Sequence, residues 1–453
     1  MTTVQPGYQG TLEERLADLA VGAQWTDLPQ DARGYAEALA VDALANAIAG
    51  RTAETVAEFE AATTALSGPG RHAVCGGRPL AAWAAAGQNA YQMTVHTMCD
   101  VYRPALCHVT PEVVPAALAA AELAGASGSD FLLASALGLE VTTRVCLALD
   151  YPAFRARGWH SPGVAGAIGA AAAAGRLLGL SAAGMTGCLG LAGAQAAGTF
   201  AAMGTVAVKF HQANGARAGL SAALYAAGGF AGSRRILTAA DGGILASYSG
   251  GGSPDRACAG LGRSWELRNI SMRAYPGAST LQALVDCLLS EQAQQAQRAG
   301  QVTGVTVWLP PHAYRLGSGG WDSQLAAMQS ARFVAAAVLH LGDCWLDTFG
   351  PDRRDDPAIA GFASRSAEIC QADDLEEGAV RVRISGPGCD LELARAFPRG
   401  DCRDPLSAGE VRAKAARCIA AGLPQARSDA ALAVLTSLGA APDIGALARA
   451  VTT

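Results

Sequence analysis

Lysine is almost absent from this sequence of 453 residues. Of its 34 basic residues only Lys209 and Lys414 are lysines, and the other 32 are arginines. Against these stand 39 acidic residues, so the formal charge is -5 and no basic excess indicates binding to nucleic acid or to an anionic membrane surface. The composition therefore favours a small molecule as the partner.

Closely spaced cysteine pairs are also lacking, and the first residues do not have the pattern of a secretory signal. The twelve cysteines run from Cys75 to Cys418 without a single C-x-x-C pair, which fits neither a disulfide framework nor a structural zinc site. We expect them to be buried small hydrophobes in a reducing compartment. The first twenty residues show no basic segment followed by an apolar one, so the sequence predicts a cytoplasmic protein rather than a secreted one.

The common catalytic signatures are missing as well. The chain contains no H-E-x-x-H, no G-x-x-x-x-G-K-[ST], no G-x-S-x-G and no EF-hand loop, so metal and nucleotide sites lose their best support. The glycine clusters at 249–253 and 317–320 do not lie between a strand and a helix, and we interpret them as turns.

Apolar residues are abundant, at 51% of the chain against 16% charged residues, which is enough for one large core or two ordinary ones. No charged side chain occurs from Leu177 to Val208, a length that could cross a bilayer. This stretch is mostly Ala and Gly, whose transfer energies are small, so closely packed helices in a soluble bundle are the better interpretation.

Helical signals dominate the first 260 residues or so. Residues 11–24 start with a capping box and repeat leucine on one face, a second start at 27–29 leads to a helix ending at Gly50, and capped starts recur at 110–112 and 129–130. Further helices broken by glycine are expected between 162 and 232.

The spacing of apolar residues changes from helical to alternating later in the chain. Residues 300–310 and 379–388 alternate like half-buried strands, and 323–342 between them is predicted as one helix. The sequence thus predicts a mainly α protein with a smaller α/β domain inserted near the C-terminus. The predicted boundaries are 1–267 with 399–453 for the helical domain and 268–398 for the α/β domain.

Lys209 is the most informative single residue. A chain that uses arginine almost everywhere has a lysine here, and a partly buried lysine can exchange its proton whereas an arginine cannot. The alternative is a lysine that extends its ammonium to solvent from a helix end. Lys414, on an amphipathic segment, is predicted to be an ordinary solvated residue.

Two of the seven histidines stand out by their position. His160 follows Trp159 in a turn that leads into a glycine and alanine rich helix, and His108 lies just before the start at Pro111. Helix starts favour nearby anions, so both histidines are candidates for binding or proton transfer.

Several segments together resemble the 2-methylcitrate dehydratase family (MmgE/PrpD), which includes cis-aconitate decarboxylases and an iminodisuccinate epimerase. The resemblance covers most of the chain and rests on their order and spacing. The segments are VDALANAIAG, HVTPEVVPAALAAAELAGASG, GWHSPGVAGAIGAAAAAGRLLGL, the Lys209 segment, RAYPGAS and DPLSAGEVRAK. The resemblance implies a large helical domain, a smaller α/β lid domain, a homodimer, and a site between the domains that needs neither metal nor organic cofactor.

Carried over by position, the family's site residues fall on His160, Lys209 and His108. The family's acidic stretch is reduced to one carboxylate, Asp100, and its lysine before Tyr-Pro becomes Arg273. A histidine expected after Tyr-Pro falls near Ala278, and a lid tyrosine falls on Phe333. The spacing around His211 is one residue short, so His211 is left out of the predicted site.

The surviving residues suit acid–base chemistry on a carboxylic acid. His160 and Lys209 can move protons, with His108 and Asp100 beside them, while Arg273, Arg103 and Tyr275 are expected to bind the substrate. The sequence predicts a lyase that dehydrates a hydroxy acid or decarboxylates an unsaturated one. An isomerase or epimerase of a related acid, and a paralogue that binds its ligand without turnover, remain alternatives.

Overall fold

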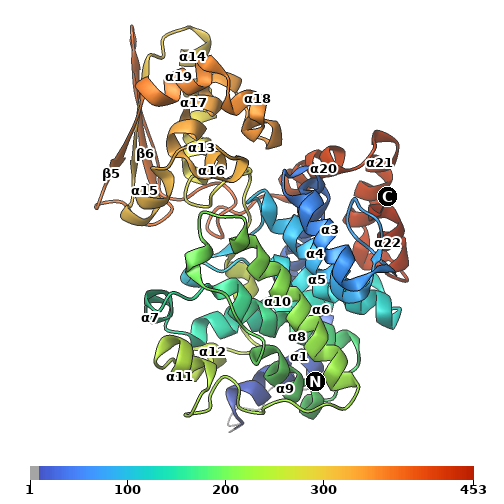
Figure 1. Ribbon diagram of the computed structural model, residues 1–453. Coiled ribbons are helices and arrows are strands. Elements are labelled where there is room, and N and C mark those ends of the chain that lie inside the picture. Colours follow the sequence, from blue (N-terminus) through green and yellow to red (C-terminus); the bar gives the residue numbers. More distant parts are fainter. Residues whose placement is uncertain (1–9, 453) are drawn as a thin grey trace. The chain divides into compact units, whose positions relative to one another are not determined.

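The computed structural model describes residues 10–452 and divides into two units. The first comprises the chain up to Val95, Cys99–Ser271 and the part from Ser407 onward. The second comprises His96–Met98 and Met272–Leu406. The first unit is almost entirely helical and the second contains the larger sheet, so the protein is mainly α with a small mixed sheet toward the C-terminus (Figure 1).

The first unit contains most of the helices. They are α1 (Leu12–Gly22), α2 (Gln30–Ala49), α3 (Val56–Ser67), α4 (Ala82–Val95), α5 (Thr110–Ala124), α6 (Gly128–Ala148), α7 (Tyr151–Ala156), α8 (Ala167–Leu177), α9 (Ala182–Gly193), α10 (Ala207–Ala227), α11 (Ile244–Ser249), α12 (Pro254–Cys258), α20 (Ala408–Gly422), α21 (Gln425–Thr436) and α22 (Gly445–Val451). A π-helical turn, Pro162–Gly166, precedes α8. Strand β1 (Pro69–His72) is short, and β2 (Val101–Tyr102) pairs antiparallel with β3 (Ile270–Ser271).

The predicted helix starts are largely confirmed. Thr11 and Glu14 form the capping box of α1, since each side chain accepts from the other residue's backbone N–H. Helix α5 begins at Thr110 as expected. Helix α6 begins slightly earlier than predicted, because Ser127 rather than Ser129 provides the N-cap and accepts from the Asp130 backbone N–H.

Small residues let the central helices of the first unit approach closely. Helix α8 packs against α5, α6 and α10, and its residues from Ala167 to Gly175 are all buried. A Cβ added at Gly219 of α10 would lie 2.4 Å from the Cβ of Ala170, and one at Gly138 of α6 would lie 2.7 Å from the Gly169 carbonyl oxygen. Glycine is therefore required where these helices cross.

The uncharged stretch from Leu177 to Val208 is not one long helix. It contains α9, which ends at Gly193, and then an irregular segment before α10. Within the described residues one helix, α6, is long and apolar enough to cross a membrane, and 94% of its apolar window is buried inside the structure. This is the pattern of a core helix.

The second unit is built on a four-stranded mixed sheet. Its order is β5 (Ala367–Gln371), β4 (Gly304–Leu309), β6 (Val380–Gly386), β7 (Cys389–Arg395), and only the β4–β5 pair is parallel. The helices are α13 (Gln282–Leu288), α14 (Glu291–Arg298), α15 (Pro311–Gly317), α16 (Gln324–Gln329), α17 (Ala331–Leu341), α18 (Pro351–Arg354) and α19 (Pro357–Arg365). Alternate residues of β4 are buried in their core, as the period of two predicted.

One predicted helix of this unit is divided in two. The segment 323–342 forms α16 and α17, with Ser330 between them in an extended conformation. The Ser330 hydroxyl accepts from the Phe333 backbone N–H and donates to the Gly319 carbonyl, so it caps a new helix instead of continuing the old one.

The prediction for Lys414 is wrong. Its side chain is buried in the first unit and lies 2.7 Å from Asp42 in an ion pair whose two side chains are 4% and 3% exposed. Asp42 also accepts from the Asn46 side-chain amide at 3.0 Å. The amphipathic pattern of α20 did not reveal this, because the carboxylate comes from α2, more than 370 residues away in the chain.

The cysteine prediction holds for eight of the twelve, which are buried. Cys258, Cys370, Cys389 and Cys402 are only partly buried. All twelve are free thiols.

Candidate functional site

The loop from Asp100 to Thr110 places the first pair of predicted site residues. The Asp100 carboxylate is fully buried and accepts from the backbone N–H groups of Val109 and Thr110, at 2.8 and 3.0 Å, and from the Thr110 hydroxyl. These donors form the start of α5, where a negative charge is favoured. The Asp100 carbonyl oxygen lies 2.7 Å from Nδ1 of His108, so the same residue orients that ring.

This geometry fixes the tautomer of a neutral His108. A carbonyl oxygen can only accept, so Nδ1 carries the proton and donates it to Asp100. The other ring nitrogen, Nε2, is then an acceptor. His108 therefore offers a base rather than an acid.

The backbone between Asp100 and His108 contains a strained turn, which hydrogen bonds on both sides stabilise. Leu106 has φ +41°, in the left-handed region that a leucine rarely adopts. Tyr102 and Cys107 bracket it with two backbone hydrogen bonds of 2.7 and 3.1 Å. Such strain persists only where the surroundings determine the backbone, which is common at binding sites.

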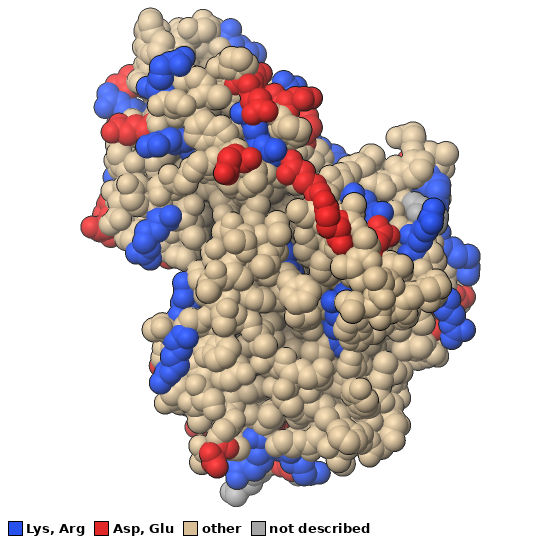
Figure 2. All heavy atoms as spheres, in the orientation of Figure 1, with Lys and Arg blue, Asp and Glu red and all other residues tan. Residues whose placement is uncertain are grey.

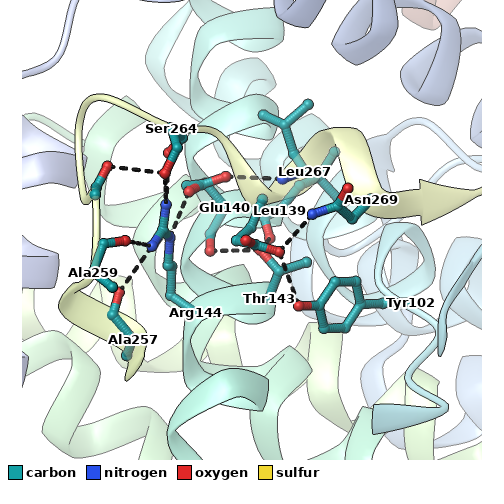
Figure 3. A network of polar contacts seen from close by, with 12 residues as sticks. Tyr102, Leu139, Glu140, Thr143, Arg144, Ala257, Ala259, Ser264, Leu267 and Asn269 are labelled. Atoms are coloured by element: carbon teal, nitrogen blue, oxygen red, sulfur yellow. Dashed lines mark hydrogen bonds and ion pairs between the residues drawn. The ribbon is translucent and has the colours of Figure 1, made fainter. Parts of the chain in front are cut away.

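A buried polar network anchors the strand that follows Asp100 (Figure 3). The Tyr102 hydroxyl donates to Glu266, and Glu140 of α6 accepts from the Leu267 backbone N–H at 2.9 Å. Glu140 also pairs with Arg144 at 2.7 Å, and Arg144 donates to the carbonyls of Ala257, Ala259 and Ser264. Burial raises the pKa of Glu140, and the Arg144 charge opposes that rise. The network fixes strand β2 and the segment of chain that precedes β3.

The turn around His160 is tied to this loop. The Ser161 hydroxyl donates to the Ala105 carbonyl at 2.8 Å, and the His160 backbone N–H donates to the Gly198 carbonyl at 3.0 Å. The π-helical turn Pro162–Gly166 follows directly, and such turns are frequent at functional sites. The His108 loop and the His160 turn are thus neighbours in the first unit.

His211 lies against His160, although the sequence analysis left it out of the site. Their Nδ1 atoms are 2.9 Å apart. Lys209 is two residues earlier on α10, and a Cβ at Gly198 would come within about 3 Å of the His211 ring, so a glycine is needed to seat the pair. The one-residue difference in spacing misled the sequence argument, because the start of α10 brings this ring to His160 all the same.

The surroundings of His160 keep its imidazole neutral. Its side chain is 5% exposed, and burial lowers its pKa to about 3, with His211, Lys209 and Arg155 adding like-charge effects in the same direction. Burial also lowers the pKa of His211. Lys209 is itself only 4% exposed. A largely desolvated, uncharged histidine pair beside a lysine is poised to receive an anionic ligand.

The short contact within the histidine pair gives the two rings complementary roles. One Nδ1 donates and the other accepts, so the donor ring has a bare Nε2 and the acceptor ring has a protonated Nε2. The two roles are exchanged when the shared proton shifts, the acceptor ring loses its Nε2 proton and the donor ring gains one at Nε2. The pair can therefore supply one acid and one base at the same time.

Glu112 is a second residue that the sequence analysis missed as a site candidate. It is fully buried on the first turn of α5, and neither carboxyl oxygen has a hydrogen-bond partner among the described residues. The sequence showed it only as part of a helix start.

The predicted substrate-binding residues are divided between the units. Arg103 begins a short 3-10 turn in the first unit, next to β2. Arg273 and Tyr275 belong to the second unit, where Arg273 donates to the Gly277 carbonyl and the Tyr275 hydroxyl donates to Asp286 at 3.2 Å. Burial, followed by the Asp286 charge, raises the pKa of Tyr275.

Within residues 10–452 no cluster of three or more His, Cys, Asp or Glu side chains is arranged to hold a metal ion.

Two family models match this chain in succession. The MmgE/PrpD N-terminal domain matches residues 14–257, and the MmgE/PrpD C-terminal domain matches residues 275–438. The chain belongs to the MmgE/PrpD family. The first match spans most of the helical unit and includes the His108 loop, the His160 turn and the start of α10.

Curated members of the family resemble this chain over most of its length. It is 26% identical over 444 residues to the cis-aconitate decarboxylase-like protein oryM of Aspergillus oryzae, covering 91% of this chain and 92% of that protein. It is 27% identical to the cis-aconitate decarboxylase of Aspergillus terreus over 79% of each chain. The human cis-aconitate decarboxylase is 27% identical over 60% of this chain and 59% of its own. These relatives support a lyase-type role in processing an organic acid.

Proposed function

We propose that this MmgE/PrpD protein is a cofactor-independent lyase that decarboxylates a small unsaturated polycarboxylic acid. The hydrogen-bonded pair of the buried His160 and the partly buried His211, beside Lys209, is the observation that carries the proposal. The similarity to cis-aconitate decarboxylases favours decarboxylation over dehydration of a hydroxy acid.

Charge explains why this site suits a polyanion. Lys209 and Arg155 already lower the pKa of His160, so a further cation is unfavourable there and an anion is favourable. A bound polycarboxylate supplies negative charge that raises the pKa of His160 toward its ordinary value. The substrate thereby converts a neutral imidazole into a proton donor.

The reaction needs one proton at carbon. When the bond to the departing carboxylate breaks, carbon dioxide leaves and its bonding electron pair stays on the remaining skeleton. His211 stabilises that developing charge, and His160 and Lys209 together deliver the proton to carbon. The next substrate, or solvent, returns a proton to the pair. Arg103 and Arg273 are proposed to hold the remaining carboxylates, because a guanidinium can bind a carboxylate with two hydrogen bonds.

The test is incubation of the purified protein with a panel of unsaturated and hydroxy polycarboxylic acids in deuterated water, followed by NMR. Release of carbon dioxide with one deuterium at carbon is the expected result. Loss of water without carbon dioxide would instead establish a dehydratase, and exchange of a C–H proton without net conversion an isomerase or epimerase. Binding without any conversion would identify a ligand-binding paralogue.

A homodimer is the expected assembly. The outer face of α10 and the segments beside it expose large apolar side chains, including Phe210, Tyr225 and Phe230. Figure 2 shows that charged side chains are sparse on the face that α10 presents in this view. An apolar face of this kind is typical of a surface covered by a partner.

A further inference from the structure

We propose that Glu112 is a positioning residue of the candidate site, a buried carboxylic acid that stays un-ionised and so leaves Asp100 as the negative charge at the start of α5. Both residues belong to the first unit. The proposal rests on the proposed function only in that His108 belongs to the site, and the experiment below needs no substrate.

The two carboxyl groups are treated very differently by their surroundings. Asp100 accepts from two backbone N–H groups and from the Thr110 hydroxyl, as a carboxylate does. Glu112 follows Thr110 by two residues on the same helical turn, yet its two oxygens accept nothing from the described residues. A buried charge without a donor is strongly unfavourable, so the proton resides on Glu112.

Two glycines, Gly166 and Gly215, leave room for the Glu112 side chain because neither has a Cβ. A Cβ added at Gly166 would lie 2.5 Å from Cγ and 2.8 Å from Cδ of Glu112, and one at Gly215 would lie 2.8 Å from Cγ. Gly166 ends the π-helical turn that follows His160, and Gly215 belongs to the helix that carries Lys209 and His211. The Glu112 side chain therefore fills the junction of the three segments that carry the site histidines.

None of the largest electrostatic influences on Glu112 from the described part of the chain is a cation. The titratable groups that act on Glu112 are Asp100 and Cys99 from the loop and Cys146 from α6, and Glu112 in turn acts on Cys107. Each of these is neutral or an anion. The π-helical turn and α10 present Gly166 and Gly215 to it. Burial first, and Asp100 second, raise the pKa of Glu112 well above its ordinary value, in agreement with the geometry.

Ionisation of Glu112 at high pH has a defined consequence. A second negative charge next to Asp100 would repel it and weaken its hold on the Val109 and Thr110 backbone N–H groups. The carbonyl of the same Asp100 orients the His108 ring, so the ring would lose its fixed position. The proton on Glu112 thus keeps the loop in the conformation that orients the His108 ring.

The test uses infrared spectroscopy of the full-length protein together with two variants. Glu112→Gln keeps the shape without the ionisable proton. Glu122→Gln is the matched control, because Glu122 lies on the same helix, is partly buried, and accepts from the Ala73 backbone N–H. The pKa of Glu122 is about 7, so well above that pH it is ionised. We expect an un-ionised carboxyl band that persists there in the wild type and in Glu122→Gln but is missing from Glu112→Gln.

Amide hydrogen exchange reports on the positioning itself. In the wild type the Val109 and Thr110 amides should lose protection as the infrared band disappears with rising pH, while in Glu112→Gln they should stay protected. If Glu112→Gln does not fold, Glu112→Met serves instead, since the carboxyl makes no hydrogen bond that folding needs. A wild-type band that titrates near the ordinary glutamate pKa, or equal loss of protection in both proteins, would overturn the proposal. Neither readout depends on turnover, so failure of the proposed function would be seen separately.

Discussion

The two lysines of this chain lie on different helices and are both buried, but their surroundings differ. Lys414 on α20 and Lys209 on α10 are both buried, at 5% and 4% exposure. Lys414 meets the Asp42 carboxylate at 2.7 Å, whereas Lys209 lies near His160 and, after burial and His211, lowers its pKa. Rarity in an arginine-rich chain therefore marked burial, and the structure places one lysine in an ion pair with α2 and the other beside the candidate histidines.

The exposed faces of α20 and α10 also differ, since one is charged and the other is apolar. Around Lys414, α20 exposes charged residues such as Arg412 and Arg417, while around Lys209 the exposed neighbour is Phe210. The Lys414 region is thus internally neutralised and solvated outside. The Lys209 region places a buried ammonium beside His160 and has apolar surface outside, which suits an anionic ligand and a protein partner.

The largest expected effect concerns stability at Lys414. Lys414→Met leaves the buried Asp42 carboxylate without its cation and should lower the free energy of unfolding by about 3–5 kcal/mol. Chemical denaturation measures this change in the free energy of unfolding. The double variant Lys414→Met/Asp42→Leu should regain most of the loss, and turnover per folded molecule should be unchanged in both. If Lys414→Met were as stable as the wild type, the structural role of this lysine would be wrong.

The next effect concerns turnover at Lys209. Lys209→Arg keeps the charge but cannot release a proton, so we expect a loss on the order of 100-fold or more in kcat with the fold retained by circular dichroism. Lys414→Arg is the matched control, because Asp42 needs only a cation, and its kcat should stay close to normal. Near-normal kcat in Lys209→Arg would assign this lysine to carboxylate binding or to structure.

A double-mutant cycle tests whether Lys209 and His160 act in the same step. His160→Ala should lose kcat by an amount similar to Lys209→Arg if both act in one step. The combined variant should then lose much less than the product of the single losses, since groups acting as a unit are not additive. Losses that multiply in steady-state kinetics would indicate that the two residues act in separate steps.

A smaller effect is the pH dependence of stability that His160 contributes. Its pKa is about 3 in the folded protein against 6.5 for a free histidine, so the unfolded chain binds more protons between these values. The contribution is complete above pH 6.5 and is lost as the pH falls toward about 3, with a slope of at most about 1.4 kcal/mol per pH unit. In urea titrations at several pH values, His160→Asn should flatten the slope. If His160→Asn left the slope unchanged, the pH dependence of the free energy of unfolding would arise from groups other than His160.

The smallest effect is on association. Phe210→Glu and Tyr225→Glu place charge on the apolar face of α10 and should weaken a homodimer by about tenfold or more in Kd. Arg412→Glu on α20 is the control and should leave association unchanged. Sedimentation velocity at micromolar concentration distinguishes them, and a wild-type monomer under those conditions would contradict the expected assembly.

Local signals predicted much of the fold. The capping box at Thr11 and Glu14, the start of α5 at Thr110 and the alternation in β4 depend on residues close together in the chain, and the structure has all three. The break at Ser330 was missed, because a serine within an otherwise apolar pattern gives no sign that its hydroxyl will bond to Gly319. The candidate residues of the site remain predictions that the proposed variants test.

The order of the segments, the period of the apolar residues and the composition are enough to indicate the family, the mainly helical class and the scarcity of lysine. The folded chain was needed to see that Lys414 pairs with Asp42, that His211 meets His160, and that the Glu112 carboxyl has no hydrogen-bond partner among the described residues. The reason is physical: protonation and pairing depend on desolvation and on charges a few ångströms away, and those neighbours come from helices and loops far apart in the chain.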